Sequence, residues 1–113
     1  MPVKTNYPDA ASKNMPGRLS NGLYYLINNP KDAGMNLRDP LAISFSRDGW
    51  TFSAPMALRK NGPPLRFPGK AKGGHSFQYS HAIEHDGNLW VIYATNKEDI
   101  EVTAFPIAEF PRL

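Results

Sequence analysis

The sequence predicts an all-β fold made of short antiparallel strands joined by ordered loops. Eleven prolines and nine glycines are many for 113 residues, and because they fall mostly between apolar runs they argue against long helices. Two Asp-Gly pairs, Asp48-Gly49 and Asp86-Gly87, each lie between apolar runs, which is the pattern of a tight hairpin turn. Since 41% of the residues are hydrophobic and 20% are charged, the composition is that of one globular domain with its own core.

The first half of the chain predicts a polar arm followed by four antiparallel strands. Residues 1–14 are polar and contain two prolines, so we expect an extended arm with at most one short strand. The strands are expected at 15–19, 23–28, 41–46 and 54–59. Ser20-Asn21-Gly22 is a good hairpin connection between the first two. Four strands in about 45 residues match one blade of a β-propeller, so 15–59 is predicted to be a blade.

The second half predicts an incomplete second blade, at 77–107, after a loop of glycine, proline and basic residues at 60–76. Its strands are expected at 77–85, 89–95 and 99–106, so the fourth strand of a blade is missing. Alternation places Phe77, Tyr79, His81, Ile83 and His85 on one face of the first of these strands. The strand at 89–95 is nearly all apolar, which predicts burial on both sides, as between stacked blades.

The stretch 46–52 contains the more informative of the two Asp-Gly turns. Gly49 tolerates the positive φ that a short hairpin loop needs, and the Asp48 carboxylate can accept hydrogen bonds from the amides of the turn. Trp50 and Phe52 have the spacing of residues on one face of the outgoing strand.

Composition and spacing exclude several classes of site. The chain has no cysteine, so it forms no disulfide and no thiolate metal site. His81 and His85 would lie about 13 Å apart along a strand, which is too far to share one metal ion, and we expect neither a metal nor a cofactor. No run of 18 apolar residues and no apolar leader is present, so we expect no membrane partner and, for the sequence as written, a cytoplasmic protein.

The net charge of +3 is concentrated in the loop at 60–76 and the residue that precedes it. It includes Arg59, Lys60, Arg66, Lys70 and Lys72. This surplus either is a solvated basic loop or attracts an anionic ligand. Because the basic residues do not interleave with the aromatic ones, we expect no nucleic-acid partner.

Four segments, at 17–30, 38–44, 77–87 and 96–102, resemble bacterial sialidase-like proteins of the BNR (Asp-box) repeat class. The resemblance runs from about residue 6 to the C-terminus, and it implies the C-terminal blades of a six-bladed β-propeller. The Asp box departs from the family pattern, because Gly49 directly follows Asp48 and the usual spacing is contracted. In that family the box is a folding device far from the active site.

The resemblance implies candidate site residues. Sialidases use a tyrosine nucleophile, a glutamate as its base, an aspartate as acid/base and three arginines that clamp the substrate carboxylate. By position Tyr79 is the candidate nucleophile, Arg18 and Arg38 are candidate clamp arginines, and His75 is a candidate pocket residue. Three of them have a structural alternative: Tyr79 as a packed tyrosine with a satisfied hydroxyl, Arg18 as an arginine that bonds loop carbonyls, and His75 as a loop histidine.

The remaining catalytic residues belong to earlier blades that this chain does not contain, and neither Glu84 nor Glu98 occupies a matching position. The favoured interpretation is therefore a non-catalytic module that binds a carbohydrate or another anion. The alternatives are an exo-sialidase-type glycoside hydrolase acting on acidic sugars and a purely structural, truncated gene product. Three copies would supply about six blades, so we expect self-association as a homotrimer, with the arm at 3–7 completing a blade.

Overall fold

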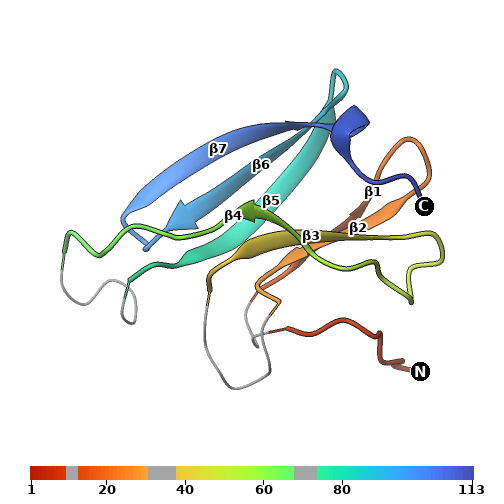
Figure 1. The fold of residues 1–113 in the computed structure, drawn as a ribbon, viewed down its shortest axis with the longest axis horizontal. Helices are drawn as coiled ribbons and strands as arrows, with labels where there is room; N and C mark the ends of the chain where they lie inside the picture. The colour runs from red at the N-terminus through yellow and green to blue at the C-terminus, as the bar shows by residue number, and fades with distance from the viewer. Residues whose placement is uncertain (10–12, 31–37, 68–73) are drawn as a thin grey trace.

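The computed structural model describes residues 1–9, 13–30, 38–67 and 74–113. These residues form two antiparallel sheets, one of four strands and one of three, and a single turn of 3-10 helix, η1, at Ile107–Glu109 (Figure 1). The prediction of an all-β fold is confirmed. The two sheets have the strand content expected for part of a propeller, and they do not close into a barrel.

The first sheet is a meander in which each strand pairs with the next strand along the chain. Its strands are β1 (Met15–Arg18), β2 (Tyr24–Asn28), β3 (Leu41–Ser46) and β4 (Met56–Arg59). The loop between β1 and β2 is closed by the Gly22 amide, which donates to the Leu19 carbonyl at 2.9 Å. The order of the four strands is the one predicted for the blade at 15–59.

The Asp-Gly turn between β3 and β4 forms as predicted, but the residues after it are not a strand. Asp48 Oδ1 accepts the amides of Trp50 and Thr51 at 2.8 and 2.9 Å, and Gly49 has a φ of +83°. These bonds curl the chain, so β4 begins only at Met56. The prediction that Trp50 and Phe52 share a strand face is therefore wrong, and Trp50 is 52% exposed.

The second sheet contains β5 (Phe77–His85), β6 (Asn88–Thr95) and β7 (Asp99–Pro106) in sequence order. Two tight turns connect the strands, at Asp86-Gly87 and at Asn96-Lys97. Both residues of each turn have positive φ, between 51° and 77°, as type I′ hairpins require. The strands thus occupy nearly the positions that the turn residues predicted.

A β-bulge near the start of β5 interrupts the alternation of this strand and separates Phe77 from the residues predicted to share its face. Phe77 pairs with Thr95 and His81 pairs with Ile92, so four steps along β5 match three steps along β6. The extra residue lies next to Tyr79, whose φ is +58°. Phe77 consequently points into the core while His81 points out, and the prediction that they share a face is wrong.

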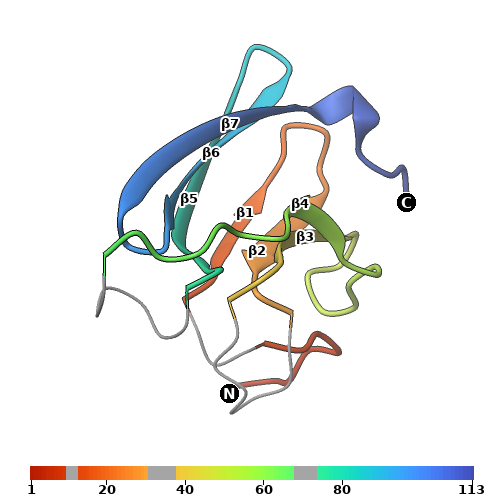
Figure 2. The same ribbon diagram turned by 60° about the vertical axis from the view of Figure 1, so that its left-hand side comes forward.

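The core lies between the two sheets, where the inward side chains of both sheets form one cluster. Ile27 and Ile43 from the first sheet and Leu89 and Val91 from the second are each 0% exposed. The first strands of the sheets, β1 and β5, lie side by side (Figure 2). This is the relation that the inner strands of neighbouring propeller blades would have.

The N-terminal arm covers the face of the first sheet that points away from the core. Asn28 Nδ2 donates to the Pro8 carbonyl at 2.9 Å and to the Asp9 carboxylate at 3.0 Å. The Asn6 side chain pairs with the backbone of Phe52, whose ring lies 5.9 Å from that of Tyr7. Residues 1–9 form no strand, so the arm expected to complete a blade here binds its own first sheet.

The prediction that β6 is buried on both sides holds for only one side. Leu89, Val91 and Tyr93 point into the core and are at most 1% exposed. Trp90 and Ile92 point the other way and are 39% and 41% exposed, because no described segment covers that side of the second sheet. We call this side the outer face of the second sheet.

Candidate functional site

Three segments of the chain meet around the side chain of Tyr79. The tyrosine is 48% exposed and lies at the bulge of β5. The guanidinium carbon of Arg38 lies 5.5 Å from the centre of its ring, and Lys97 Nζ lies 5.6 Å from the same point. At these distances both cations interact with the face of the ring.

Backbone hydrogen bonds fix the positions of the two cations. The Arg38 carbonyl accepts the Phe77 amide at 2.8 Å, which holds Arg38 beside the start of β5. The turn that carries Lys97 is tied to the same place, because the Asn96 amide donates to the Ser76 carbonyl at 2.7 Å. The Asn96 side chain returns the contact by accepting the Ser76 amide at 2.8 Å. Arg38, Tyr79 and Lys97 form one cluster, which we call the Tyr79 cluster.

The two cations change the acidity of the phenol. Hydrogen bonding from Arg38, and then from Lys97, lowers the pKa of Tyr79 below the usual value of 10.0. The cause is that a nearby positive charge favours the phenolate over the neutral phenol. The cluster is therefore suited to hold negative charge, whether on the tyrosine or on a ligand.

The carboxylates next to these cations in sequence accept backbone amides of the loop at 61–66. Asp39 accepts the amides of Asn61 and Gly62 at 3.1 and 2.7 Å. Glu98 accepts the Arg66 amide at 3.0 Å, and its side chain is 2% exposed. Because both carboxylates are engaged by backbone N–H groups, neither is placed to act as an acid or base on a ligand at Tyr79.

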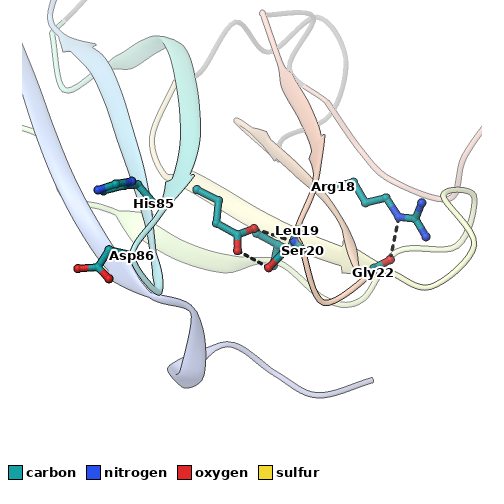
Figure 3. Close-up of a pocket in the computed structure, with 7 residues that line it drawn as sticks. Arg18, Leu19, Ser20, Gly22, His85 and Asp86 are labelled. Atoms are coloured by element: carbon teal, nitrogen blue, oxygen red, sulfur yellow. Dashed lines mark hydrogen bonds between the residues drawn. The ribbon is translucent and has the colours of Figure 1, made fainter.

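Arg18 lies at the other end of the sheets from Tyr79. Its Nε donates to the Gly22 carbonyl at 3.3 Å, and its guanidinium lies 4.9 Å from the centre of the Tyr24 ring. Ser20, two residues after Arg18, donates two hydrogen bonds to the carboxylate of Glu84 (Figure 3). Glu84 lies near the end of β5, five residues after Tyr79. Five residues of strand span roughly 16 Å, so the structure does not bring Arg18 and Tyr79 together.

An open pocket beside Arg18 is lined by residues from both sheets and their turns. The Glu84 carboxylate accepts bonds from the backbone amide and the hydroxyl of Ser20. Figure 3 shows the side chain of Arg18 turned away towards Gly22. Leu19, His85 and Asp86 complete the lining. The arginine thus bonds a loop carbonyl, which is the structural alternative that the sequence left open.

His75 forms hydrogen bonds within the loop that precedes β5. Its backbone has a φ of +51°, its amide donates to the Pro63 carbonyl at 3.0 Å, and Nδ1 bonds the Gly62 carbonyl. The histidine therefore fastens the segment at 62–63 to the start of β5. Of the four residues singled out from the sequence, the structure brings only Tyr79 and Arg38 together.

Lys97 is the member of the Tyr79 cluster that sequence reasoning missed. It belonged to a recognised segment, but its role depends on the type I′ turn that directs it towards β5. The available signal was Asn96, a residue that tolerates the positive φ of a type I′ turn, but the side to which Lys97 points depends on the tertiary structure.

Neither metal sites nor membrane-spanning helices are found in the described part of the chain. No group of three or more histidine, aspartate and glutamate side chains among these residues could hold a metal ion. No helix among them is long and apolar enough to cross a bilayer. Comparisons with models of protein families, with curated proteins and with solved structures give no significant match.

Proposed function

We propose that this protein is a sialidase-type propeller module that binds an acidic sugar, or another small anion, at the Tyr79 cluster without cleaving it. The observation that carries the proposal is the arrangement of two cations over one half-exposed tyrosine ring. The resemblance of the sequence to sialidase-like proteins suggests the class of ligand. The two neighbouring sheets, with β1 beside β5, are consistent with a pair of propeller blades.

The chemistry of the three side chains suits a carboxylate on a sugar. The planar guanidinium of Arg38 can donate two parallel hydrogen bonds to a carboxylate, and Lys97 adds a second positive charge. Tyr79 offers an apolar ring and a polar hydroxyl to the body of the sugar. Asp39 and Glu98, the described carboxylates next to the two cations in sequence, are engaged by backbone amides, so neither opposes the anion and neither is placed to supply the proton that glycoside cleavage requires.

Titration with N-acetylneuraminic acid, followed by two-dimensional NMR or calorimetry, tests the proposal. We expect saturable binding that weakens as the salt concentration rises, and no binding of neutral N-acetylglucosamine. Arg38→Gln and Lys97→Gln should each weaken binding about three- to tenfold, the effect of one charged contact worth about 1 kcal/mol. Arg47→Gln and Lys4→Gln remove exposed cations elsewhere and should leave the affinity unchanged.

The lowered pKa of Tyr79 favours a second candidate, a glycoside hydrolase with Tyr79 as nucleophile. A phenol that ionises more readily is a better nucleophile, and flanking cations would stabilise the phenolate. Turnover of a fluorogenic sialoside separates the two functions. Hydrolysis that is lost in Tyr79→Phe while the sugar still binds would favour the enzyme, whereas binding without turnover favours the module.

A further inference from the structure

The outer face of the second sheet is an apolar surface that spans all three of its strands. Five large apolar side chains project from it, with exposed fractions between 39% and 76%: Ile83, Trp90, Ile92, Ile100 and Val102. Cross-strand pairing makes the surface continuous, because Ile83 lies opposite Trp90 and Ile92 lies opposite Val102. His81 joins four of these residues in lining a shallow groove across the sheet.

The glutamates of β5 and β7 do not point to the centre of the outer face. Glu101 lies between Ile100 and Val102, and strand alternation directs it to the opposite side, where it accepts a bond from Arg59 at 3.0 Å. Glu84 is directed towards Ser20 of the first sheet. A partner that approaches the centre of the outer face therefore meets apolar groups and the imidazole of His81, with the imidazole of His85 at one end.

The apolar area matches that of a standard-sized specific interface between two copies. A Trp side chain offers about 150–250 Å² and Ile and Val offer less, so the five side chains, which are 39–76% exposed, present on the order of 500 Å² of apolar surface. This lies within the range of about 300–600 Å² for the largest apolar patch of a typical monomer, and such a patch is often an interaction site. If about 65% of a homodimer interface is apolar, each copy would bury roughly 800 Å², the area typical of specific complexes.

The two sheets of one chain differ in how their outward faces are covered. The arm already covers the first sheet, through Asn6, Tyr7 and the bond from Asn28 to Pro8. Only the second sheet presents a bare apolar face among the described residues. A face of this kind is complementary to a second face of the same kind, so the asymmetry favours contact between like surfaces.

We propose that a second copy of this chain binds the outer face of the second sheet, giving a twofold-symmetric dimer in which two such faces pack together. This arrangement leaves both arms in place on their own first sheets. A closed ring of three copies would instead press each outer face against the first sheet of the next copy, where the arm lies. The dimer is independent of whether an anion binds at the Tyr79 cluster.

Light scattering during size-exclusion chromatography of the full chain tests the proposal. The protein is loaded at about 5–200 µM, a range on the order of ordinary dimer dissociation constants. We expect a mass of twice the 12.6 kDa of one chain. Ile92→Lys should reduce the mass to that of one chain and leave the far-ultraviolet circular dichroism unchanged, because this side chain is 41% exposed. Phe67→Lys changes a side chain that is 55% exposed and lies off the face, so it should remain dimeric.

A single cysteine distinguishes the symmetric dimer from a ring. The chain has no cysteine of its own, so Ile92→Cys places the sole thiol at the centre of the outer face. In the dimer, two such thiols lie near the symmetry axis, and mild oxidation should give a covalent dimer, while Phe67→Cys should give little. A wild-type chain that stays at 12.6 kDa across this range overturns the proposal. A mass of three chains without cross-linking overturns it in favour of the ring.

Discussion

Replacing Gly17 with alanine should destabilise the protein, although the same change in an ordinary strand stabilises it. Gly17 lies directly opposite Tyr25 in the pair of β1 and β2. A Cβ atom at Gly17 would lie 2.2 Å from both Cζ and Oη of that tyrosine and 2.6 Å from Cε1. The ring is 5% exposed and belongs to the core cluster, so it cannot move into solvent without losing its packing.

The expected magnitude is a balance of two opposing effects. Alanine in place of glycine in a strand gains about 0.5–1 kcal/mol, because the unfolded chain has less freedom to lose. Forcing extra volume into a packed core costs about 1–3 kcal/mol. We therefore expect Gly17→Ala to lower the free energy of unfolding by about 1–2 kcal/mol, which corresponds to a fall in Tm of roughly 4–12 °C for a domain of this size.

Urea unfolding followed by circular dichroism measures the effect, and a double-mutant cycle identifies its cause. In a Tyr25→Leu background the clashing ring atoms are absent, so alanine at position 17 should cost nothing or should stabilise. Both backgrounds are compared at the same pH and protein concentration, since association changes apparent stability. A Gly17→Ala protein as stable as the wild type, or an equal loss in both backgrounds, would refute the steric reasoning.

Three other predictions concern charged groups. The hydrogen bonds from Thr51, Trp50 and Ser46 lower the pKa of Asp48 below 3.8. The stabilisation that these bonds give is therefore present above about pH 4 and is lost as the pH falls through the folded-state pKa. Between pH 6 and 2, the free energy of unfolding should fall less steeply for Asp48→Asn than for the wild type. In ultraviolet titration at the phenolate band, Arg38→Gln should raise the pKa of Tyr79 towards 10.0, whereas an unchanged titration would contradict the contact. Arg59→Met leaves Glu101 without its 3.0 Å partner between the sheets and should cost about 1 kcal/mol in chemical denaturation, with no loss meaning that solvent replaces the ion pair.

Local turn chemistry explains why most of the fold could be predicted from the sequence. Gly22, Asp48-Gly49 and Asp86-Gly87 each mark a point where the chain must reverse, and apolar runs lie between them. The predicted strands at 41–46, 77–85 and 99–106 therefore coincide with β3, β5 and β7. Those turn preferences depend on the residues themselves and their neighbours, so they can be read without knowledge of the rest of the chain.

The candidate site could be predicted only in part. Tyr79 and Arg38 were singled out, but Arg18 lies at the opposite end of the sheets and Lys97 was not expected. The reason is that strand alternation predicts which face a side chain lies on only where the pairing register of the two strands is regular. The bulge beside Tyr79 changes the register, and no residue at 77–81 is of a type that predicts a bulge.

By itself, the sequence determined that this chain forms a meander of four strands followed by one of three, with the Asp-Gly turns in fixed places. Only the tertiary structure decided that Arg38 and Lys97 meet at Tyr79, that the arm covers the first sheet, and that the outer face of the second stays bare. Turns are set by the φ preferences of single residues. The other features depend on which distant segments pack together, because their contacts join residues 18 to 41 positions apart and are selected by the whole core.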